Sequence, residues 1–535
     1  MELLPSAHVD TFCRDRLPPA DQWPEFLFEP PVPDYPDRLN CATVLLDDTI
    51  TERGGARPCL HAKGSPTWTY DDLRAAANRI AHVLVEDRRL VPGNRVLLRG
   101  PNTPWLAACW FAVLKAGGVV VATMPLLRTH ELRVISEIAA PDLALVDHRF
   151  LEAMQGLDVP VVCFGGDAEG DLTGLAASRP ADFDDVLTSA DDVALLAFTS
   201  GTTGRPKCAM HFHRDVLAMA DTFSAQVLQP SPYDVFTGTP PIAFTFGLGG
   251  DLVFPLRAGA SALLIEKATP AELAALIEEY GVTTLFTAPT AYKAMLAAGA
   301  RLTSLRAAVS AGEHLPAATW DAFHRATGVK IIDGIGSTEM LHIFIASSGD
   351  DIRPGSTGRA VPGYVATVLD EEGHEVPAGQ PGRLAVKGPT GCRYLDDPRQ
   401  QVYVQHGWNI TGDTYRMDED GYFWYLARSD DMIISSGYNI AAPEVEEAVL
   451  KHPDVSECAV VGWPDEQRGM IVKAYVVLAE GVAPDPELVP KLQDFVKAEI
   501  APYKYPRAIE FVDELPRTQT GKLQRFRLRE TSPQS

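Results

Sequence analysis

Short apolar, β-branched runs alternate with helical patterns between about residues 191 and 339, and this alternation constrains the fold more than any other feature of the sequence. The strand-like runs are residues 193–198, 261–265, 283–287 and 306–309, and helical patterns begin at Arg214 and Pro270. Strands that alternate with helices form a parallel, helix-covered sheet, and the loops at the strand ends are available to ligands. The sequence therefore predicts an α/β fold with a binding site at the strand ends.

The pattern changes after Gly355, where short strands such as residues 364–369 and 383–386 are separated by Gly, Pro and Asp turns. Such spacing is typical of a smaller antiparallel region. Beyond a boundary near Arg428, Pro443 suits the first position of a helix, and two strand-like runs follow it. The chain is therefore expected to end in a compact α+β unit.

The charge balance limits the classes of partner. Among 535 residues, Lys and Arg number 47 against 71 for Asp and Glu, which gives a net charge of −24. This balance disfavours broad binding to nucleic acid or to anionic membranes, so an anionic substrate needs a local cationic site. With 46% hydrophobic residues, a globular enzyme of two or more domains is the default class.

Targeting and metal signals are weak. The start of the chain lacks the basic segment and apolar core of a secretory signal, and Lys115 interrupts the most apolar stretch, residues 106–124. The eight cysteines contain no Cys-x-x-Cys, which indicates neither a disulfide framework nor a zinc site. His211 and His213 lack a third ligand in the sequence and are interpreted as structural. We expect a cytoplasmic protein with no membrane span.

One segment has the composition of a phosphate-binding loop, and it stands between an apolar strand and a helix. It reads Thr199-Ser200-Gly201-Thr202-Thr203-Gly204-Arg205-Pro206-Lys207. The glycines let backbone N–H groups turn inward, the hydroxyls add donors, and Lys207 supplies positive charge for a polyphosphate. The spacing is not that of a Walker loop. The alternative is a polar surface turn, which would need neither the hydroxyls nor the lysine.

Five other segments carry candidate site residues. They are Gly312-Glu313, Asp333-Gly334-Ile335-Gly336-Ser337-Thr338-Glu339, Trp408-Asn409-Ile410-Thr411-Gly412-Asp413, Arg428-Ser429-Asp430-Asp431 and Pro516-Arg517-Thr518-Gln519-Thr520-Gly521-Lys522. Taken alone, Thr338-Glu339 also suits a helix start and Gly412-Asp413 a hairpin turn. The functional interpretation depends on their occurring together.

In that order, these motifs resemble those of the adenylate-forming superfamily, which includes acyl- and aryl-CoA ligases, luciferases and peptide-synthetase adenylation domains. The resemblance covers nearly the whole chain. It implies an α/β fold with a large N-terminal domain of doubly wound mixed sheets plus a small β-barrel, and a smaller, mobile α+β C-terminal domain. The implied parts are residues 1–428 for ATP and acid binding, a hinge at 429–431, and a lid at 432–535.

The resemblance also implies the roles of individual residues. Thr338 would contact the α-phosphate of ATP, Glu339 would bind Mg²⁺, and Asp413 would accept hydrogen bonds from both ribose hydroxyls. The implied ATP site comprises Thr199, Ser200, Gly201, Thr202, Thr203, Gly204, Lys207, Gly312, Glu313, Asp333, Gly334, Ile335, Thr338, Asp413 and Arg428. The cosubstrates would be ATP and coenzyme A, with Mg²⁺ as cofactor.

The last motif resembles the loop that delivers the catalytic lysine, here Lys522. Asp430 would absorb the backbone rotation of the hinge, although Ala427 replaces the glycine that the family usually has before Arg428. That rotation would withdraw the lysine and bring in the pantetheine tunnel. The tunnel residues would be Gly437, Tyr438 and Asn439.

The expected acid pocket has two walls with aromatic faces and small glycines, which favour a flat ring over a long chain. One wall would hold Phe244, Thr245, Phe246 and Gly247, and the other Ile335, Gly336 and His342. Residues 334–344 are similar to benzoate-CoA ligases, and residues 8–46 are similar to 2-aminobenzoate-CoA ligases. The first choice of acid is therefore 2-aminobenzoate and the second is benzoate.

Two other functions compete with this interpretation. The nearest is a freestanding aryl-acid adenylating enzyme that loads a carrier protein, since CoA and a carrier both present a thiol. The distant one is a nucleotide-binding protein without catalysis, which the presence of the hydroxyl loop, Glu339, Asp413 and Lys522 disfavours. The partners would be an aromatic carboxylic acid, ATP and CoA, and the chain would be a monomer or homodimer.

Overall fold

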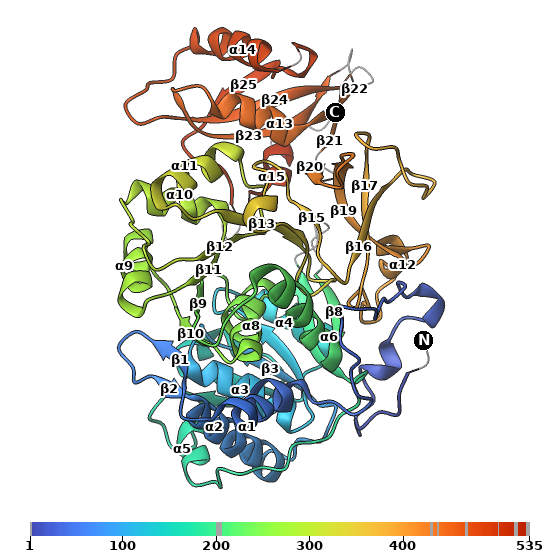
Figure 1. Ribbon diagram of the computed structural model, residues 1–535, viewed down its shortest axis with the longest axis vertical. Coiled ribbons are helices and arrows are strands. Elements are labelled where there is room, and N and C mark those ends of the chain that lie inside the picture. Colours follow the sequence, from blue (N-terminus) through green and yellow to red (C-terminus); the bar gives the residue numbers. More distant parts are fainter. Residues whose placement is uncertain are drawn as a thin grey trace. The chain divides into compact units, whose positions relative to one another are not determined.

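The computed structural model describes residues 3–199, 206–428, 432–435, 438–465, 469–500, 502–517 and 523–530 (Figure 1). The chain divides into two compact units, one of Met1–Ala366 with Val386–Asn409 and the other of Thr367–Ala385 with Ile410–Ser535. The boundary at residue 428 and the hinge at 429–431 stay predictions.

A six-stranded sheet holds the strand that leads into the phosphate loop. Its order is β6 (Val161–Phe164), β5 (Leu143–Asp147), β3 (Arg95–Arg99), β4 (Val119–Thr123), β7 (Val193–Thr199) and β8 (Lys207–Phe212). All neighbours are parallel except β7 and β8, which pair antiparallel with Thr199 opposite Lys207. The sheet is therefore mixed, and both ends of the predicted phosphate loop are fixed by one strand pair.

A nine-stranded sheet contains the second nucleotide segment. Its order is β15 (Arg359–Ala360), β14 (Ile343–Ala346), β13 (Ile331–Gly336), β12 (Ala307–Ser310), β11 (Thr284–Thr287), β9 (Val235–Gly238), β10 (Ser261–Leu264), β1 (Pro58–Ala62) and β2 (Trp68–Thr69). The strands from β13 to β1 are parallel and the outer ones are antiparallel. The single sheet that the alternation predicted is thus two sheets, with β7 in one and β9 to β13 in the other.

Helices accompany both sheets, and α9 to α11 flank the strands of the nine-stranded sheet (Figure 1). The α-helices of this unit are α1 (Thr49–Arg53), α2 (Tyr70–His82), α3 (Pro104–Lys115), α4 (Thr129–Ala139), α5 (Leu172–Ala177), α6 (His213–Met219), α7 (Thr245–Leu248), α8 (Phe254–Ala258), α9 (Pro270–Tyr280), α10 (Pro289–Ala297), α11 (Ala317–Thr327) and α12 (Gln400–Tyr403). Local sequence sets the ends of α9. Thr269 and Glu272 form a capping box, and Gly281 ends the helix with a φ of 63°.

The region after Gly355 is a five-stranded sheet, as the change of pattern predicted. Its strands are β16 (Val365–Leu369), β17 (Pro381–Lys387), β19 (Trp408–Met417) and β18 (Val404–Gln405), with β20 (Phe423–Arg428) also paired to β19. Both β18 and β20 run antiparallel to β19. This sheet occupies the place of the small β-barrel that the resemblance implied.

The end of the chain is an α+β unit, as predicted. It holds the hairpin β21 (Met432–Ser435) with β22 (Tyr438–Ala441), the sheet β23 (Val455–Asp465), β24 (Gly469–Leu478) and β25 (Ala508–Phe511), and helices α13 (Ala442–Leu450), α14 (Leu488–Glu499) and α15 (Arg525–Glu530). Helix α13 begins one residue earlier than predicted, so Pro443 is its second residue, a position where its missing N–H costs nothing.

Two further features concern the cysteines and the helices. The eight cysteines are all free, and seven of them are buried. None of the helices in the described part of the chain has the length and apolar character needed to cross a membrane.

A buried lysine ties the N-terminal segment to the six-stranded sheet's helices. Lys115, at the end of α3, has no exposed surface. Its ammonium lies 2.5 Å from a carboxylate oxygen of Asp47 and 2.9 Å from both oxygens of Asp185. Two carboxylates from distant parts of the chain thus meet at one buried cation.

We predict that Lys115→Met lowers the free energy of unfolding of this unit by about 3–5 kcal/mol, because it leaves two carboxylates without their cation. The matched control is Lys330→Met, whose partner Asp350 is fully exposed and whose loss should cost less than about 1 kcal/mol. The midpoint of urea denaturation measures both. Equal shifts in the two variants would show that the Lys115 cluster contributes no more than a surface pair.

Candidate functional site

The lysine that ends the predicted phosphate loop faces two tyrosines. Strand β8 begins with Lys207, and residues 393–395 run alongside it. The two segments are joined by backbone hydrogen bonds, one of which runs from the N–H of Met210 to the carbonyl of Arg393 at 2.8 Å. This pairing places Tyr394 beside the lysine. The Lys207 ammonium lies 4.8 Å from the centre of the Tyr394 ring and 5.5 Å from that of Tyr403, within the range of cation–π attraction.

The carboxylate of Glu339 meets the same lysine and tyrosine. Glu339 is 6% exposed, its Oε1 lies 3.3 Å from the Lys207 ammonium, and the Tyr394 hydroxyl donates to the same oxygen at 2.5 Å. Burial and the charge of Glu339 raise the pKa of Tyr394 above its ordinary value, so the hydroxyl keeps its proton and remains a donor. Sequence reasoning missed Tyr394, which stands 55 residues from Glu339.

The turn that carries Thr338 and Glu339 is held at both ends. The Ser337 hydroxyl lies 3.1 Å from that of Tyr403 and accepts from the N–H of Met340 at 3.2 Å. The backbone then reverses at Leu341, which has a φ of +68° and donates its N–H to the carbonyl of Thr338 at 3.2 Å. A leucine rarely adopts this left-handed conformation, so the surrounding contacts must enforce it.

His211 holds the same turn through the carbonyl of Thr338. Its Nε2 lies 2.8 Å from the carbonyl oxygen of Thr338, and because a carbonyl only accepts, Nε2 must carry the proton. Its Nδ1 lies 3.8 Å from Asp215, which forms a buried ion pair with Arg393. Burial alone would raise the pKa of Asp215, but Arg393 and His211 hold it below the ordinary value.

The two histidines of the His-x-His pair have no metal-binding arrangement. His213 contacts the thiol of Cys41 at 3.2 Å, and burial lowers the pKa of this histidine to about 3, so the ring is neutral. Among the residues that the structure describes, no three His, Cys, Asp or Glu side chains are grouped so as to hold a metal ion. Glu339 is therefore a lone carboxylate, which suits a cation that takes its other ligands from a phosphate and water.

The remaining nucleotide residues lie at strand ends and turns. Asp333, Gly334 and Ile335 are in β13, and burial raises the pKa of Asp333 to about 8. Gly312 has a φ of +89° just beyond β12. In the other unit, Asp413 of β19 stands opposite Arg428 of β20, with 3.4 Å between carboxylate and guanidinium. The structure thus brings together the two residues predicted near the ribose.

Several predicted site residues fall outside the described part of the chain. They are Ser200, Gly201, Thr202, Thr203, Gly204, Asp430, Gly437 and Lys522. Thr199 ends β7, and Tyr438 and Asn439 begin β22. The roles of all these residues stay predictions.

The two predicted walls of the acid pocket meet at His342. Its ring lies 5.7 Å from that of Phe246, 5.4 Å from Phe223 and 4.5 Å from Phe254. Burial among these rings lowers the pKa of His342 to about 3, and the backbone of Phe246, which lies near the ring, acts in the opposite direction. A neutral imidazole has one donor nitrogen and one acceptor nitrogen.

Glycines let the backbone of both walls approach closely. A Cβ at Gly336 would lie 2.6 Å from the carbonyl oxygen of His342, and one at Gly247 would lie 2.3 Å from that of Pro241. Neither position has room for a side chain. Phe244 and Thr245 line a small cavity together with Trp110.

The AMP-binding enzyme family matches residues 46–393, and its C-terminal domain matches residues 444–522. The chain is 36% identical over 518 residues to the benzoate–CoA ligase of Thauera aromatica, with 94% of this chain and 97% of that protein covered. A solved structure of the anthranilate CoA ligase AuaEII in complex with anthranoyl-AMP has a TM-score of 0.87 and 34% identity, covering 93% and 98% of the two chains. A benzoate CoA ligase from Burkholderia xenovorans LB400 has a TM-score of 0.83 and 31% identity, covering 92% and 100%.

The chain therefore belongs to the AMP-binding enzyme family, and its fold is that of the adenylate-forming superfamily. It is an AMP-forming acid–thiol ligase, as the motifs predicted.

We predict that His211→Leu lowers the rate of acid-dependent exchange of pyrophosphate into ATP by roughly tenfold, since an unpaired buried carbonyl costs about 1–3 kcal/mol. The reason is that Thr338 and Glu339 lose their common support. His211→Gln should recover most of the rate because its amide nitrogen can reach the same carbonyl.

The Mg²⁺ concentration at half-maximal rate distinguishes this positioning role from general destabilisation. It should rise in His211→Leu and return in His211→Gln, while the KM for the acid stays the same. A loss of rate with an unchanged Mg²⁺ requirement, or no recovery with glutamine, would contradict the positioning role.

Proposed function

We propose that this chain is an aryl-acid CoA ligase. An aromatic carboxylate oxygen attacks the α-phosphorus of ATP, pyrophosphate leaves, and an aryl-adenylate remains. The CoA thiol then attacks the carbonyl carbon of that adenylate, the bond to the phosphate oxygen breaks, and aryl-CoA and AMP are released. The observation that carries the proposal is the buried Glu339 carboxylate held by Lys207 and Tyr394 at the end of the Thr338 turn.

The geometry of Glu339 fits Mg²⁺. Among the described residues, its contacts with Lys207 and Tyr394 both fall on Oε1, which leaves Oε2 to face a cation. When bound at Glu339, Mg²⁺ would neutralise charge on the phosphates of ATP. Tyr394 orients the carboxylate, and Lys207, the last residue of the predicted phosphate loop, places an ammonium beside it. Catalysis of this kind depends on positioning and electrostatics rather than on a covalent enzyme intermediate.

We propose 2-aminobenzoate as the acid and benzoate as the alternative. The side chains packed around His342, which belong to the predicted acid-pocket walls and their neighbours, are aromatic, and aromatic walls suit a flat ring. The candidates for a hydrogen bond to an ortho amine are the imidazole of His342 and the hydroxyl of Thr245. A pocket that makes such a bond discriminates by up to about 10⁴-fold, whereas an apolar pocket discriminates by about 10–200-fold. Two of the similar proteins act on anthranilate and benzoate, which supports the aromatic class.

A panel of aromatic and aliphatic acids with ATP tests the proposal, scored by thioester formation with CoA and with carrier-bound pantetheine. We expect turnover with 2-aminobenzoate and benzoate on free CoA, and little with straight-chain acids. Preference for an aliphatic acid would overturn the aromatic assignment. Transfer to the carrier alone would favour the carrier-loading enzyme, and no pyrophosphate exchange with any acid would favour the inactive nucleotide-binding protein.

We predict that Lys522→Ala lowers adenylate formation by roughly a hundredfold or more, the scale of losing one preorganised charge donor. Acid-dependent pyrophosphate exchange measures this step alone. Lys451→Ala, an exposed lysine on the same unit, is the matched control and should leave the rate unchanged. An unchanged exchange rate in Lys522→Ala would refute the role of this lysine.

We predict that Asp430→Pro leaves adenylate formation largely intact and slows thioester formation, because proline fixes φ and restricts rotation at the proposed hinge. Pyrophosphate exchange and single-turnover transfer from preformed adenylate to CoA separate the two half-reactions. Equal losses in both would argue against a hinge at this residue.

A further inference from the structure

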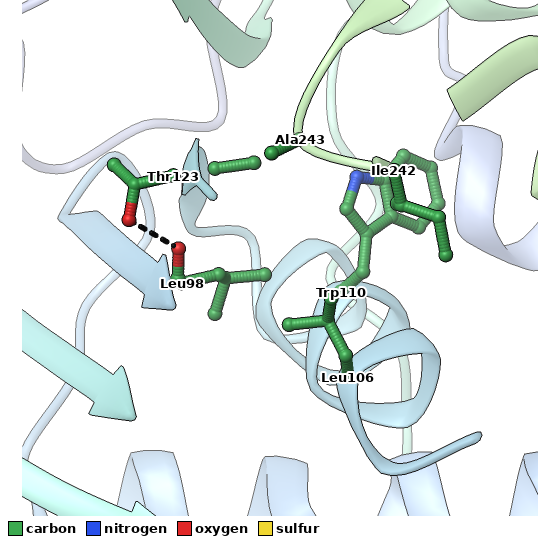
Figure 2. A pocket seen from close by; sticks show the side chains of 7 residues that line it. Leu98, Leu106, Trp110, Thr123, Ile242 and Ala243 are labelled. Carbon is green, nitrogen blue, oxygen red and sulfur yellow. Dashed lines mark hydrogen bonds between the residues drawn. The ribbon is translucent and has the colours of Figure 1, made fainter. Parts of the chain in front are cut away.

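A small apolar cavity lies behind the loop that carries the first wall of the acid pocket (Figure 2). Leu106 and Trp110 line it from helix α3, where their spacing of four residues puts them on one face. Ile242 and Ala243 approach from the loop, as Figure 2 shows. The hydroxyl of Thr123 donates to the carbonyl of Leu98 at 2.9 Å, so this polar group of the lining is already satisfied.

The cavity continues towards the predicted acid pocket. A second cavity shares Trp110, Ala122, Ile242 and Ala243 with the first. It extends past Ala197 to Phe244 and Thr245, both expected in the acid-pocket wall. The two cavities thus adjoin each other, and the second reaches residues of that wall.

The cavity lies at the carboxyl ends of parallel strands, where parallel sheets commonly bind ligands. Leu98, Ala122 and Ala197 are near the carboxyl ends of β3, β4 and β7, three neighbouring parallel strands. Strand β7 leads directly into the predicted phosphate loop. Any acid activated at that loop therefore lies at the same edge of the sheet as the cavity.

The loop over the cavity is firmly held. The Asn102 side chain accepts from the N–H of Ile242 at 2.8 Å and donates to the carbonyl of Pro240 at 3.1 Å. The same amide donates to Asp251 at 3.1 Å, and burial raises the pKa of Asp251 well above its ordinary value. Burial thus disfavours the charged form of Asp251, which lessens its repulsion of an anionic acid nearby. The cavity thus has a defined wall.

We propose that this cavity is an extension of the acid pocket that accepts a small apolar substituent, such as a methyl group or a chlorine atom, on the aromatic ring of the substrate. The inference rests on the proposed function. Apart from Thr123, whose hydroxyl is already bonded to Leu98, and the indole N–H of Trp110, the lining is hydrocarbon, so most of the surface of a substituent entering it would contact apolar groups. Trp110 and Ala122 therefore determine the size of ring substituent, although neither belongs to the predicted acid-pocket walls.

The test compares benzoate with its 2-, 3- and 4-methyl derivatives by kcat/KM for thioester formation. Wild-type protein should convert at least one methylbenzoate about as well as benzoate. Ala122→Val fills the space and should lower kcat/KM for that methylbenzoate by about tenfold, since a methylene in an apolar pocket is worth about 10–200-fold, and leave benzoate within about twofold. Trp110→Phe enlarges the space and should improve the corresponding ethylbenzoate relative to benzoate.

The control is Val121→Ile, which adds a methylene on the same strand but on the opposite face. It should leave the ratio of kcat/KM for each methylbenzoate to kcat/KM for benzoate unchanged. Equal effects of Ala122→Val on benzoate and the methylbenzoate, or a wild-type protein that accepts no methylbenzoate, would overturn the inference while leaving the proposed function standing. Absence of thioester with every aromatic acid in wild-type protein would overturn both. If Ala122→Val folds poorly, Trp110→Phe provides the test. An unchanged ratio of kcat/KM for ethylbenzoate to that for benzoate in this variant would overturn the inference.

Discussion

The site depends on a buried negative charge that the protein has to compensate. A carboxylate removed from water without partners is too costly to keep ionised, and Glu339 is kept by a cation and a hydroxyl donor on one of its two oxygens. Both of these contacts are made by Oε1, and we assign the other oxygen, Oε2, to the metal ion of the proposed function. The buried carboxylate of Glu339 would destabilise the folded protein if it had no partners, and the same negative charge can bind the metal ion of a metal–nucleotide complex.

The two mixed sheets explain why these groups meet. Lys207 starts β8, directly across from the end of β7, while Glu339 follows β13 in the other sheet. Segment 393–395 pairs with β8 and brings Tyr394 to the same point. His211, which lies two residues before the start of α6, contacts the Thr338 carbonyl. Sequence positions separated by more than a hundred residues thus converge at the edge of the sheets, as parallel topology favours.

Local sequence predicted the strands well because parallel strands buried on both faces appear as continuous apolar runs. Residues 193–198 are within β7, and residues 261–265 differ from β10 by one residue. The sequence did not predict that these strands belong to different sheets, since pairing is a long-range choice that an apolar run does not encode. It also did not predict Tyr394 or the support from His211, because their partners Glu339 and Thr338 lie 55 and 127 residues away. The glycine and hydroxyl motifs could be predicted from the sequence because the functional groups of each motif lie in a few consecutive residues.

The central claim is that the acid is activated at the α-phosphorus of ATP, and isotope transfer tests it most directly. Benzoate or 2-aminobenzoate labelled with ¹⁸O in its carboxylate is converted to the CoA thioester, and the nucleotide products are analysed by mass spectrometry. Attack at the α-phosphorus leaves one labelled oxygen in AMP and none in pyrophosphate. Label in inorganic phosphate, with ADP as the nucleotide product, would contradict the account.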